Sequence, residues 1–465
     1  MKVFFWWCRL SESNQQPTDY KSVALPIELR RHIYWMYYIF RFYNTFNIYN
    51  IKAMKFELDK MWELYKIGRG PSSSHTIGPY RAVQWFLKKF QNVKSIDVIL
   101  YGSLALTGKG HLTDVSLKEA AGSTPIKIIW DVQTKTDHPN TMDIIGYDEN
   151  KKEVKRVRVI STGGGSFEVE GYDVNEHIKV FPHSSFAEIK KYCADNKMTL
   201  VDYVKKFDLE GWNYLPTVLK AMLDSVEAGI NGEGFFDGPI KMQKMTKKIL
   251  DNLKKRNFPK DSIYYAMAYG YSVAEINVQH GIVATAPTLG SAGIFPAVLY
   301  YCKHNLGYKD DMLLEMLAVG GVIGILFRRH GSIAGATGGC QAECGSACSM
   351  AAAAYVWSKK GSVEEMEAAA IIAEEHHLGL TCDAVLGCVY SPCIERNGVM
   401  AMRAIQSAEH AMITDGIQEV FDIDDIIIVE NRTGKDLKFG YRETGMGGLS
   451  LRWKEKNNHP LDNND

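Results

Sequence analysis

Six of the nine cysteines fall within residues 340–393, in two short segments. The first segment, from Gly338, reads Gly-Gly-Cys-Gln-Ala-Glu-Cys-Gly-Ser-Ala-Cys-Ser, and its cysteines are four residues apart. The second, from Cys382, reads Cys-Asp-Ala-Val-Leu-Gly-Cys-Val-Tyr-Ser-Pro-Cys-Ile-Glu-Arg-Asn. Cysteine thiolates are preferred ligands for zinc and for iron–sulfur clusters, so thiols gathered in this way indicate metal chemistry.

The spacing of these cysteines leaves the metal and the ligand set open. On a helix, Cys340, Cys344 and Cys348 would share one face, either as three ligands or with the last two as small buried packing residues. The segment from Cys382 to Cys393 contains glycine and proline and reads as a loop, which can present thiolates at different angles. Structural zinc takes four closed ligands, whereas an iron–sulfur cubane takes one ligand per iron and has an open iron when only three cysteines bind.

A run of hydroxyl residues, 72–76, precedes a helix expected over residues 78–90. Hydroxyl oxygens, backbone N–H groups and the helix dipole together make an anion site that suits a substrate carboxylate. Simple capping of the helix would need only one of these serines. We therefore predict a substrate-binding loop, made of Ser72, Ser73, Ser74, His75 and Thr76.

Lys109, His111 and His138 are candidate proton carriers, because lysine and histidine side chains commonly move protons in catalysis. His111 follows Gly-Lys-Gly, where a flexible chain can present a side chain to a cleft, although a single histidine beside glycine is more often a surface residue. His376 and His377 lie close to Cys382 in the sequence, which could indicate a catalytic role. A favourable position of histidines at the end of a helix explains them at least equally well.

Residues 163–165 are three consecutive glycines. No Lys-Ser/Thr follows them, as a phosphate-binding loop would require. We predict a tight turn or a close contact between domains.

Composition indicates an ordinary globular chain. Its 465 residues predict two or three domains, with 46% hydrophobic and 23% charged residues. The formal net charge is zero, so composition implies no nucleic-acid partner. The most apolar run, residues 316–327, is too short to span a membrane and predicts a buried core helix. Clustered thiols in a neutral chain indicate an intracellular, cytoplasmic protein.

The pattern along the chain predicts an α+β N-terminal domain followed by an all-α catalytic domain. Strands are expected at 95–101 and 126–132, with a hairpin at 142–147 and 154–160, and helices at 186–207 and 215–228. From about Pro239 onward strand signals nearly vanish. We assign residues 54–215 to the first domain, 235–453 to the second, 454–465 to a polar disordered tail and 1–53 to an extension outside the domains, with the natural start at Met54.

Eight short segments, in order along the chain, resemble the iron–sulfur L-serine dehydratases (L-serine ammonia-lyases). Four resemble the β domain of that family: 68–76, 102–111, 138–142 and 163–166. Four resemble its α domain: 286–288, 339–341, 392–397 and 441–444. Each motif is weak alone, but eight in order are specific, and they indicate a single chain in which the two domains are fused.

The resemblance implies a [4Fe-4S] cluster held by three cysteines, with the fourth iron open to the substrate hydroxyl. Matched motif by motif, the ligands are Cys340, Cys382 and Cys393. The remaining cysteines of the two segments then have packing roles. The family further implies conversion of L-serine to pyruvate and ammonia in amino-acid catabolism and gluconeogenesis. It also implies that His111, in segment 102–111, and His138, in segment 138–142, lie near the substrate. We expect a homodimer.

Two other classes remain as alternatives. A pyridoxal-phosphate dehydratase would perform the same reaction but would leave the cysteines unexplained. A non-catalytic iron–sulfur or zinc sensor would explain the cysteines, but not the serine-rich loop and the histidine motifs. The chain also departs from the family pattern near the expected site. We expect these departures to change substrate preference or activity. They are Ala384, Leu386, Cys388, Tyr390 and Leu289.

Overall fold

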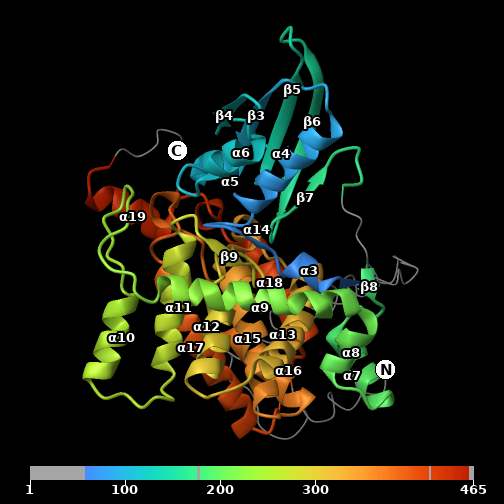
Figure 1. Ribbon diagram of the computed structural model, residues 1–465, viewed down its shortest axis with the longest axis vertical. Helices are drawn as coiled ribbons and strands as arrows, with labels where there is room; N and C mark the ends of the chain where they lie inside the picture. The colour runs from blue at the N-terminus through green and yellow to red at the C-terminus, as the bar shows by residue number, and fades with distance from the viewer. Residues whose placement is uncertain (1–57, 175–178, 418–419, 460–465) are drawn as a thin grey trace, which may run out of the picture. The chain divides into compact units, whose positions relative to one another are not determined.

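The computed structural model describes residues 58–174, 179–417 and 420–459 (Figure 1). The predicted extension 1–53 and the start at Met54 lie outside the described residues. Within them, an α+β region is followed by a mostly helical region, which confirms the predicted fold class. None of the described helices is long and apolar enough to cross a membrane.

A five-stranded sheet forms the centre of the α+β region, in the order β4-β3-β5-β6-β7. Its strands are β3 (Ser95–Tyr101), β4 (Ile126–Asp131), β5 (Thr141–Tyr147), β6 (Glu153–Gly163) and β7 (Ser166–Val169). β3 pairs with β4 in parallel, and the other pairs are antiparallel. Buried and partly exposed residues alternate along β3, which is the pattern of a strand with one face against the core. The predicted strands and the β5–β6 hairpin are confirmed.

Two helices pack with this sheet, α4 (Ile77–Lys89) and α6 (Thr113–Ala121), and a short helix, α5 (Gly102–Thr107), follows β3 directly. Figure 1 shows α4 running along the sheet beside β6 and β7. A separate hydrophobic core joins Ala82, Phe86, Val98 and Leu117 from these elements. The serine-rich segment 72–76 immediately precedes α4, and His111 lies between α5 and α6.

Two further short pairs of strands are described outside the five-stranded sheet, and one, β2 (Ile67–Arg69) with β9 (Ile282–Ala284), links residues far apart in the chain. β1 (Leu58–Asp59) pairs with β8 (Lys179–Phe181). The described α-helices of the helical region are α3 (Met61–Leu64), α7 (Phe186–Asp195), α8 (Leu200–Phe207), α9 (Leu209–Gly229), α10 (Thr246–Lys255), α11 (Tyr264–Asn277), α12 (Ile294–His304), α13 (Asp310–His330), α14 (Gly335–Cys340), α15 (Ser346–Ser358), α16 (Val363–Glu375), α17 (Cys393–Ile413), α18 (Ile423–Asp436) and α19 (Gly448–Lys456).

The large helical core includes α13, whose residues 316–327 are buried, as predicted for the apolar run. The same core takes in α3 and the helices of residues 186–229. Hydrophobic packing therefore groups these helices with the all-α region, although the predicted α+β domain extended to residue 215. The predicted helix over 186–207 is two helices, because Thr199 begins α8 with its own capping box. The tail also starts later than predicted, since α19 continues to Lys456 and buries Lys454.

Candidate active site

The serine-rich loop lies between β2 and α4 and is fully buried from Ser72 to Thr76. Thr76 precedes α4 but makes no side-chain cap hydrogen bond, so capping does not account for the hydroxyl residues. Instead, the hydroxyls of Ser74 and Ser72 lie 3.0 and 3.4 Å from Nδ1 of His75. The predicted anion-binding loop thus surrounds an imidazole, and its role in substrate binding stays a prediction.

His75 is held from both ends of its ring. Its Nε2 lies 3.0 Å from the hydroxyl of Thr107 and 3.4 Å from that of Ser103, both in α5. Burial lowers the pKa of His75 to about 4, and the nearby Glu443 opposes this only in part. The ring is therefore neutral near pH 7, and four hydroxyl groups fix its orientation.

His111 lies in the turn between α5 and α6, and its ring stacks on that of His75 with centroids 4.3 Å apart. Its Nδ1 lies 2.9 Å from the carbonyl oxygen of Thr107. A carbonyl only accepts hydrogen bonds, so Nδ1 carries the proton and Nε2 of the neutral ring holds the basic lone pair. This Nε2 lies 3.3 Å from Oε1 of Glu443.

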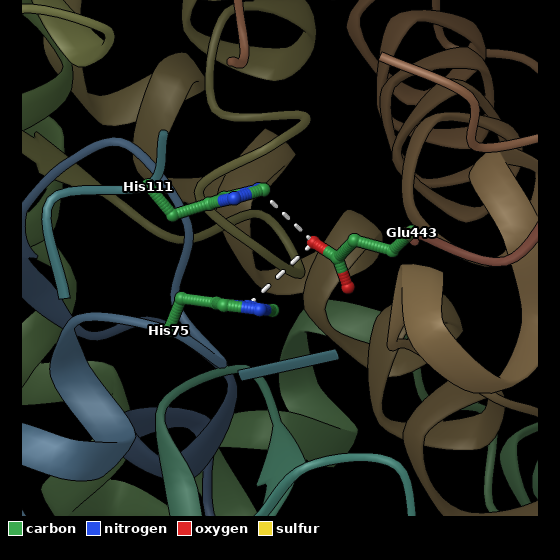
Figure 2. Close-up of side chains that lie close together, drawn as sticks. All are labelled: His75, His111 and Glu443. Carbon is green, nitrogen blue, oxygen red and sulfur yellow. Dashed lines mark ion pairs between the residues drawn. The ribbon is translucent and has the colours of Figure 1, made fainter. Parts of the chain in front are cut away.

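Glu443 faces both histidines, with Oε1 3.7 Å from Nδ1 of His75 (Figure 2). Figure 2 shows the two imidazoles side by side, both directed at the one carboxylate. Burial raises the pKa of Glu443, but its interactions with His75 and with a proton on Nε2 of His111 lower it, and the net pKa lies below its usual value. Its Oε2 is buried without a hydrogen-bond partner among the described residues. This buried carboxylate is therefore ionised beside a base that can take up a proton.

The backbone of Glu443 connects the histidines to the cysteines. Its N–H donates to the carbonyl of Cys382 at 2.8 Å, and the N–H of Cys382 donates to Tyr441 at 2.8 Å. Its carbonyl accepts from the hydroxyl of Ser103 at 2.6 Å. Residues 441–443 thus join α5 of the α+β region to the loop that carries Cys382.

The three cysteines named by the resemblance come from different elements and are all buried. Cys340 ends α14, Cys382 lies in the loop after α16, and Cys393 begins α17. A π-helical turn, η1 (Gln341–Gly345), follows Cys340, so the predicted continuous helical face is interrupted. Even so, Sγ of Cys344 lies 3.6 Å from Sγ of Cys340.

The electrostatics of these thiols fit a metal group. Hydrogen bonds from Cys344 and Cys382, together with the Arg396 guanidinium, hold the pKa of Cys340 well below its usual value. The hydrogen bond to Cys340 raises the pKa of Cys382, and burial raises that of Cys393. The Cys340 thiolate is therefore surrounded by the protonated thiols of Cys344, Cys382 and Cys393. A metal cation relieves such crowding, because its binding replaces those protons.

Glu343, on the π-helical turn, was not singled out from the sequence. Its carboxylate, that of Glu443 and Sγ of Cys382 all lie within 4.8 Å of one another. Burial and the charges of Glu443 and Cys340 raise the pKa of Glu343 well above its usual value, so it is a neutral acid that accepts a 2.8 Å hydrogen bond from Thr288. A Cβ at Gly335 would lie 2.9 Å from this carboxylate, so only glycine leaves the space open.

Family models match most of the chain. The description "Serine dehydratase beta chain" matches residues 60–123, and "Serine dehydratase alpha chain" matches residues 147–450. A curated L-serine dehydratase of Haemophilus influenzae is 34% identical over 449 residues, covering 84% of this chain and 98% of the relative. L-serine dehydratase 1 of Escherichia coli is 33% identical over 450 residues, with the same coverage.

The chain belongs to the serine dehydratase family. A further relative, an L-serine dehydratase of Streptomyces coelicolor, is 34% identical over 456 residues and covers 84% of this chain and 98% of its own length. Both family matches fall on one polypeptide, which confirms the single-chain arrangement expected from the eight ordered segments.

Two of the catalytic residues predicted from the sequence of this serine dehydratase family member do not contact His75, His111 or Glu443 among the described contacts. Lys109 is exposed and lies over the ring of Trp130, 5.7 Å from its centroid. The ring of His138 accepts a hydrogen bond from Asn140 in its own turn, and no contact with His75, His111 or Glu443 is described. A catalytic role for Lys109 or His138 stays a prediction, which these placements do not favour.

Ser103, Thr107, Glu343 and Glu443 are site residues to which no role was given from the sequence. Ser103, Thr107 and Glu443 had a signal, since they stand in the family-like segments 102–111 and 441–444, whereas Glu343 lies outside all eight segments. Glutamate is a common residue type in helices, and only its contacts distinguish Glu343. Cys348 donates to the carbonyl of Met400 at 3.5 Å, and Cys388 packs in a small apolar cluster.

Proposed function

We propose that this chain is a lyase that converts L-serine into pyruvate and ammonia, and that Cys340, Cys382 and Cys393 hold a [4Fe-4S] cluster. The observation that carries the proposal is the backbone pairing of Cys382 with Glu443. It brings thiols suited to a metal group within reach of a buried base. The names of the relatives, all L-serine dehydratases, support the substrate.

A cluster with three protein ligands supplies a Lewis-acidic iron that helps a hydroxyl group to leave. The protein supplies the proton transfer. In our proposal, Nε2 of His111 takes the Cα proton of serine, and Glu443 stabilises the imidazolium that forms. The neutral ring of His75, fixed by hydroxyl groups, holds the stacked ring of His111 in place.

The substrate carboxylate binds, in this proposal, at the loop Ser72–Thr76, where the N-terminus of α4 favours an anion. Loss of the Cα proton and of the β-hydroxyl as water produces aminoacrylate. Aminoacrylate tautomerises to an imine, and water hydrolyses the imine to pyruvate and ammonia. In this proposal the carboxyl group of Glu343, beside Cys382, whose raised pKa favours its protonated form, donates a proton to the departing hydroxyl.

Anaerobic purification tests this function. We expect a brown protein with about four irons per chain that forms pyruvate from L-serine without added pyridoxal phosphate. A yellow protein whose turnover needs pyridoxal phosphate would instead identify the lysine-dependent class of dehydratase. A colourless, zinc-loaded chain without turnover would support the sensor alternative and overturn the proposal.

A further inference from the structure

A cavity of about 310 Å³ lies where the glycine turn after β6 meets the loop between α13 and α14. It shares no lining residue with the histidines, Glu443 or the cysteines described above. Its lining is rich in groups that bind anions. The cations are Arg328, Arg329 and Lys435, and the hydroxyl groups are those of Thr162, Ser166, Ser332 and Thr337. Two acids, Asp59 and Glu168, also face it, so the lining has one excess positive charge.

Arg328, in the last turn of α13, has an incomplete set of hydrogen bonds. Its side chain is 10% exposed. Nη2 donates to the hydroxyl of Ser166 at 3.1 Å, whereas Nη1 is buried without a hydrogen-bond acceptor among the described residues, and Oδ2 of Asp59 lies 3.7 Å from it. A buried guanidinium N–H group without an acceptor costs free energy, so an added oxygen atom at this position would be stabilising.

Arg328 lies among both carboxylates and cations. Glu63 lies 3.6 Å from Nη2 of Arg328, and Lys66 and Arg81 are its other cationic neighbours. Burial raises the pKa of Glu63, yet these three cations together lower it to about 2. Glu63 is therefore ionised, and Asp59 and Glu63 are carboxylates that face the Arg328 guanidinium.

The two segments that form this cavity, the glycine turn after β6 and the loop after α13, are each connected to the candidate active site. Gly163 and Gly164 have positive φ, and a Cβ on Gly164 would lie 2.9 Å from Ile333, so the turn packs directly on the loop that leads to Cys340. This contact confirms the close approach predicted for the three glycines. Next to the glycine turn, the hydroxyl of Ser161 in β6 donates to the carbonyl of Ser74 at 2.8 Å.

We propose that this cavity binds a small phosphate-type oxyanion, either inorganic phosphate or a phosphate monoester, and that the bound anion fastens the glycine turn to the loop 331–337. A tetrahedral dianion has enough oxygen atoms to accept from Arg328 Nη1 and from the rim cation Lys435. The hydroxyls of Ser332 and Thr337 also line the cavity, where they bond to each other at 2.6 Å and Thr337 donates to the carbonyl of Ala334. The site is distinct from the serine-converting site, and its existence does not depend on the proposed function.

Calorimetric titration of the full chain with inorganic phosphate, against chloride at matched ionic strength, tests the site. We expect saturable binding that weakens at least tenfold in Arg328→Lys, which keeps the charge but loses the fork, and in Lys435→Gln. Lys435 is exposed, so its variant is expected to fold normally. Arg432→Gln, which removes an exposed cation of the same helix outside the lining, is the control and should bind like the wild type.

Methyl phosphate, titrated in the same way, distinguishes a phosphate monoester from inorganic phosphate as the natural ligand, because the anion of the matching kind should bind with the higher affinity. Amide hydrogen exchange in residues 331–337 should slow when phosphate binds, because the loop is then held to the turn. The proposal is overturned if phosphate produces no more heat than chloride, or if both lining variants bind phosphate as tightly as the wild type. Neither measurement uses serine turnover, so their failure would be separate from failure of the proposed function.

Discussion

Nε2 of His111 lies 3.3 Å from Oε1 of Glu443, although the two residues are 332 positions apart in the sequence. The proton on Nδ1 of His111 is committed to the carbonyl of Thr107, so the only ring nitrogen that can exchange a proton is the one that faces the carboxylate. The pair therefore has the arrangement of a base and the group that stabilises its charged form. The first prediction tests this arrangement.

Replacing Glu443 by glutamine should lower kcat for serine at least about 100-fold, because the imidazolium of His111 loses its counter-charge while the shape of the side chain is kept. Iron content should be unchanged, since the backbone pairing with Cys382 does not need the carboxylate. Steady-state kinetics and iron analysis of the same sample check both. Glu455→Gln, at a solvent-accessible ion pair, is the matched control. Normal turnover of Glu443→Gln would rule out the His111–Glu443 pair.

His111→Asn and His138→Asn separate the two histidines that were equal candidates from the sequence. Only His111 lies against Glu443 and His75. We expect about a 100-fold to 10,000-fold loss of kcat for His111→Asn and a change of a few-fold for His138→Asn. The opposite order, measured with iron content intact, would transfer the role of base to His138.

The cysteines separate into ligands and neighbours. Serine at position 340, 382 or 393 should reduce bound iron and abolish turnover, because a serine hydroxyl does not replace a thiolate ligand. Cys388→Ser, in the same loop as Cys382, and Cys344→Ala should keep about four irons per chain. Cys344 is the sharper control, because its sulfur lies 3.6 Å from that of Cys340. Loss of iron in Cys344→Ala would make it a ligand and revise the assignment.

His377 should make the fold less stable as the pH falls. Burial lowers its pKa from 6.5 to about 4, so between these values the unfolded chain binds a proton that the folded chain does not. The free energy of unfolding therefore decreases as the pH falls from about 6.5 towards 4, by about 2 kcal/mol at pH 5 for this one group. Urea denaturation between pH 7.5 and 5 measures the slope, and His377→Gln should flatten it. An unchanged slope in the variant would show that other groups dominate.

Local patterns in the sequence were sufficient for much of the fold. The alternation in residues 95–101, the turn between 147 and 153 and the apolar run 316–327 each specify an element through nearby residues alone. The domain boundary predicted at residue 215 stays a prediction, because the grouping of helices into domains depends on distant contacts. Helices of residues 186–229 look alike in either domain, and only their packing places them in the helical core.

For the site, the sequence by itself determined the residue types: thiols in two segments, a serine-rich loop before a helix, and histidines beside glycine. The tertiary structure decided which of them meet. Lys109 and His111 are two residues apart, yet one lies over Trp130 and the other against Glu443. The physical reason is that the site is assembled by long-range hydrogen bonds, such as the one from Ser103 to Glu443 across 340 residues. No local pattern of residues encodes such a contact.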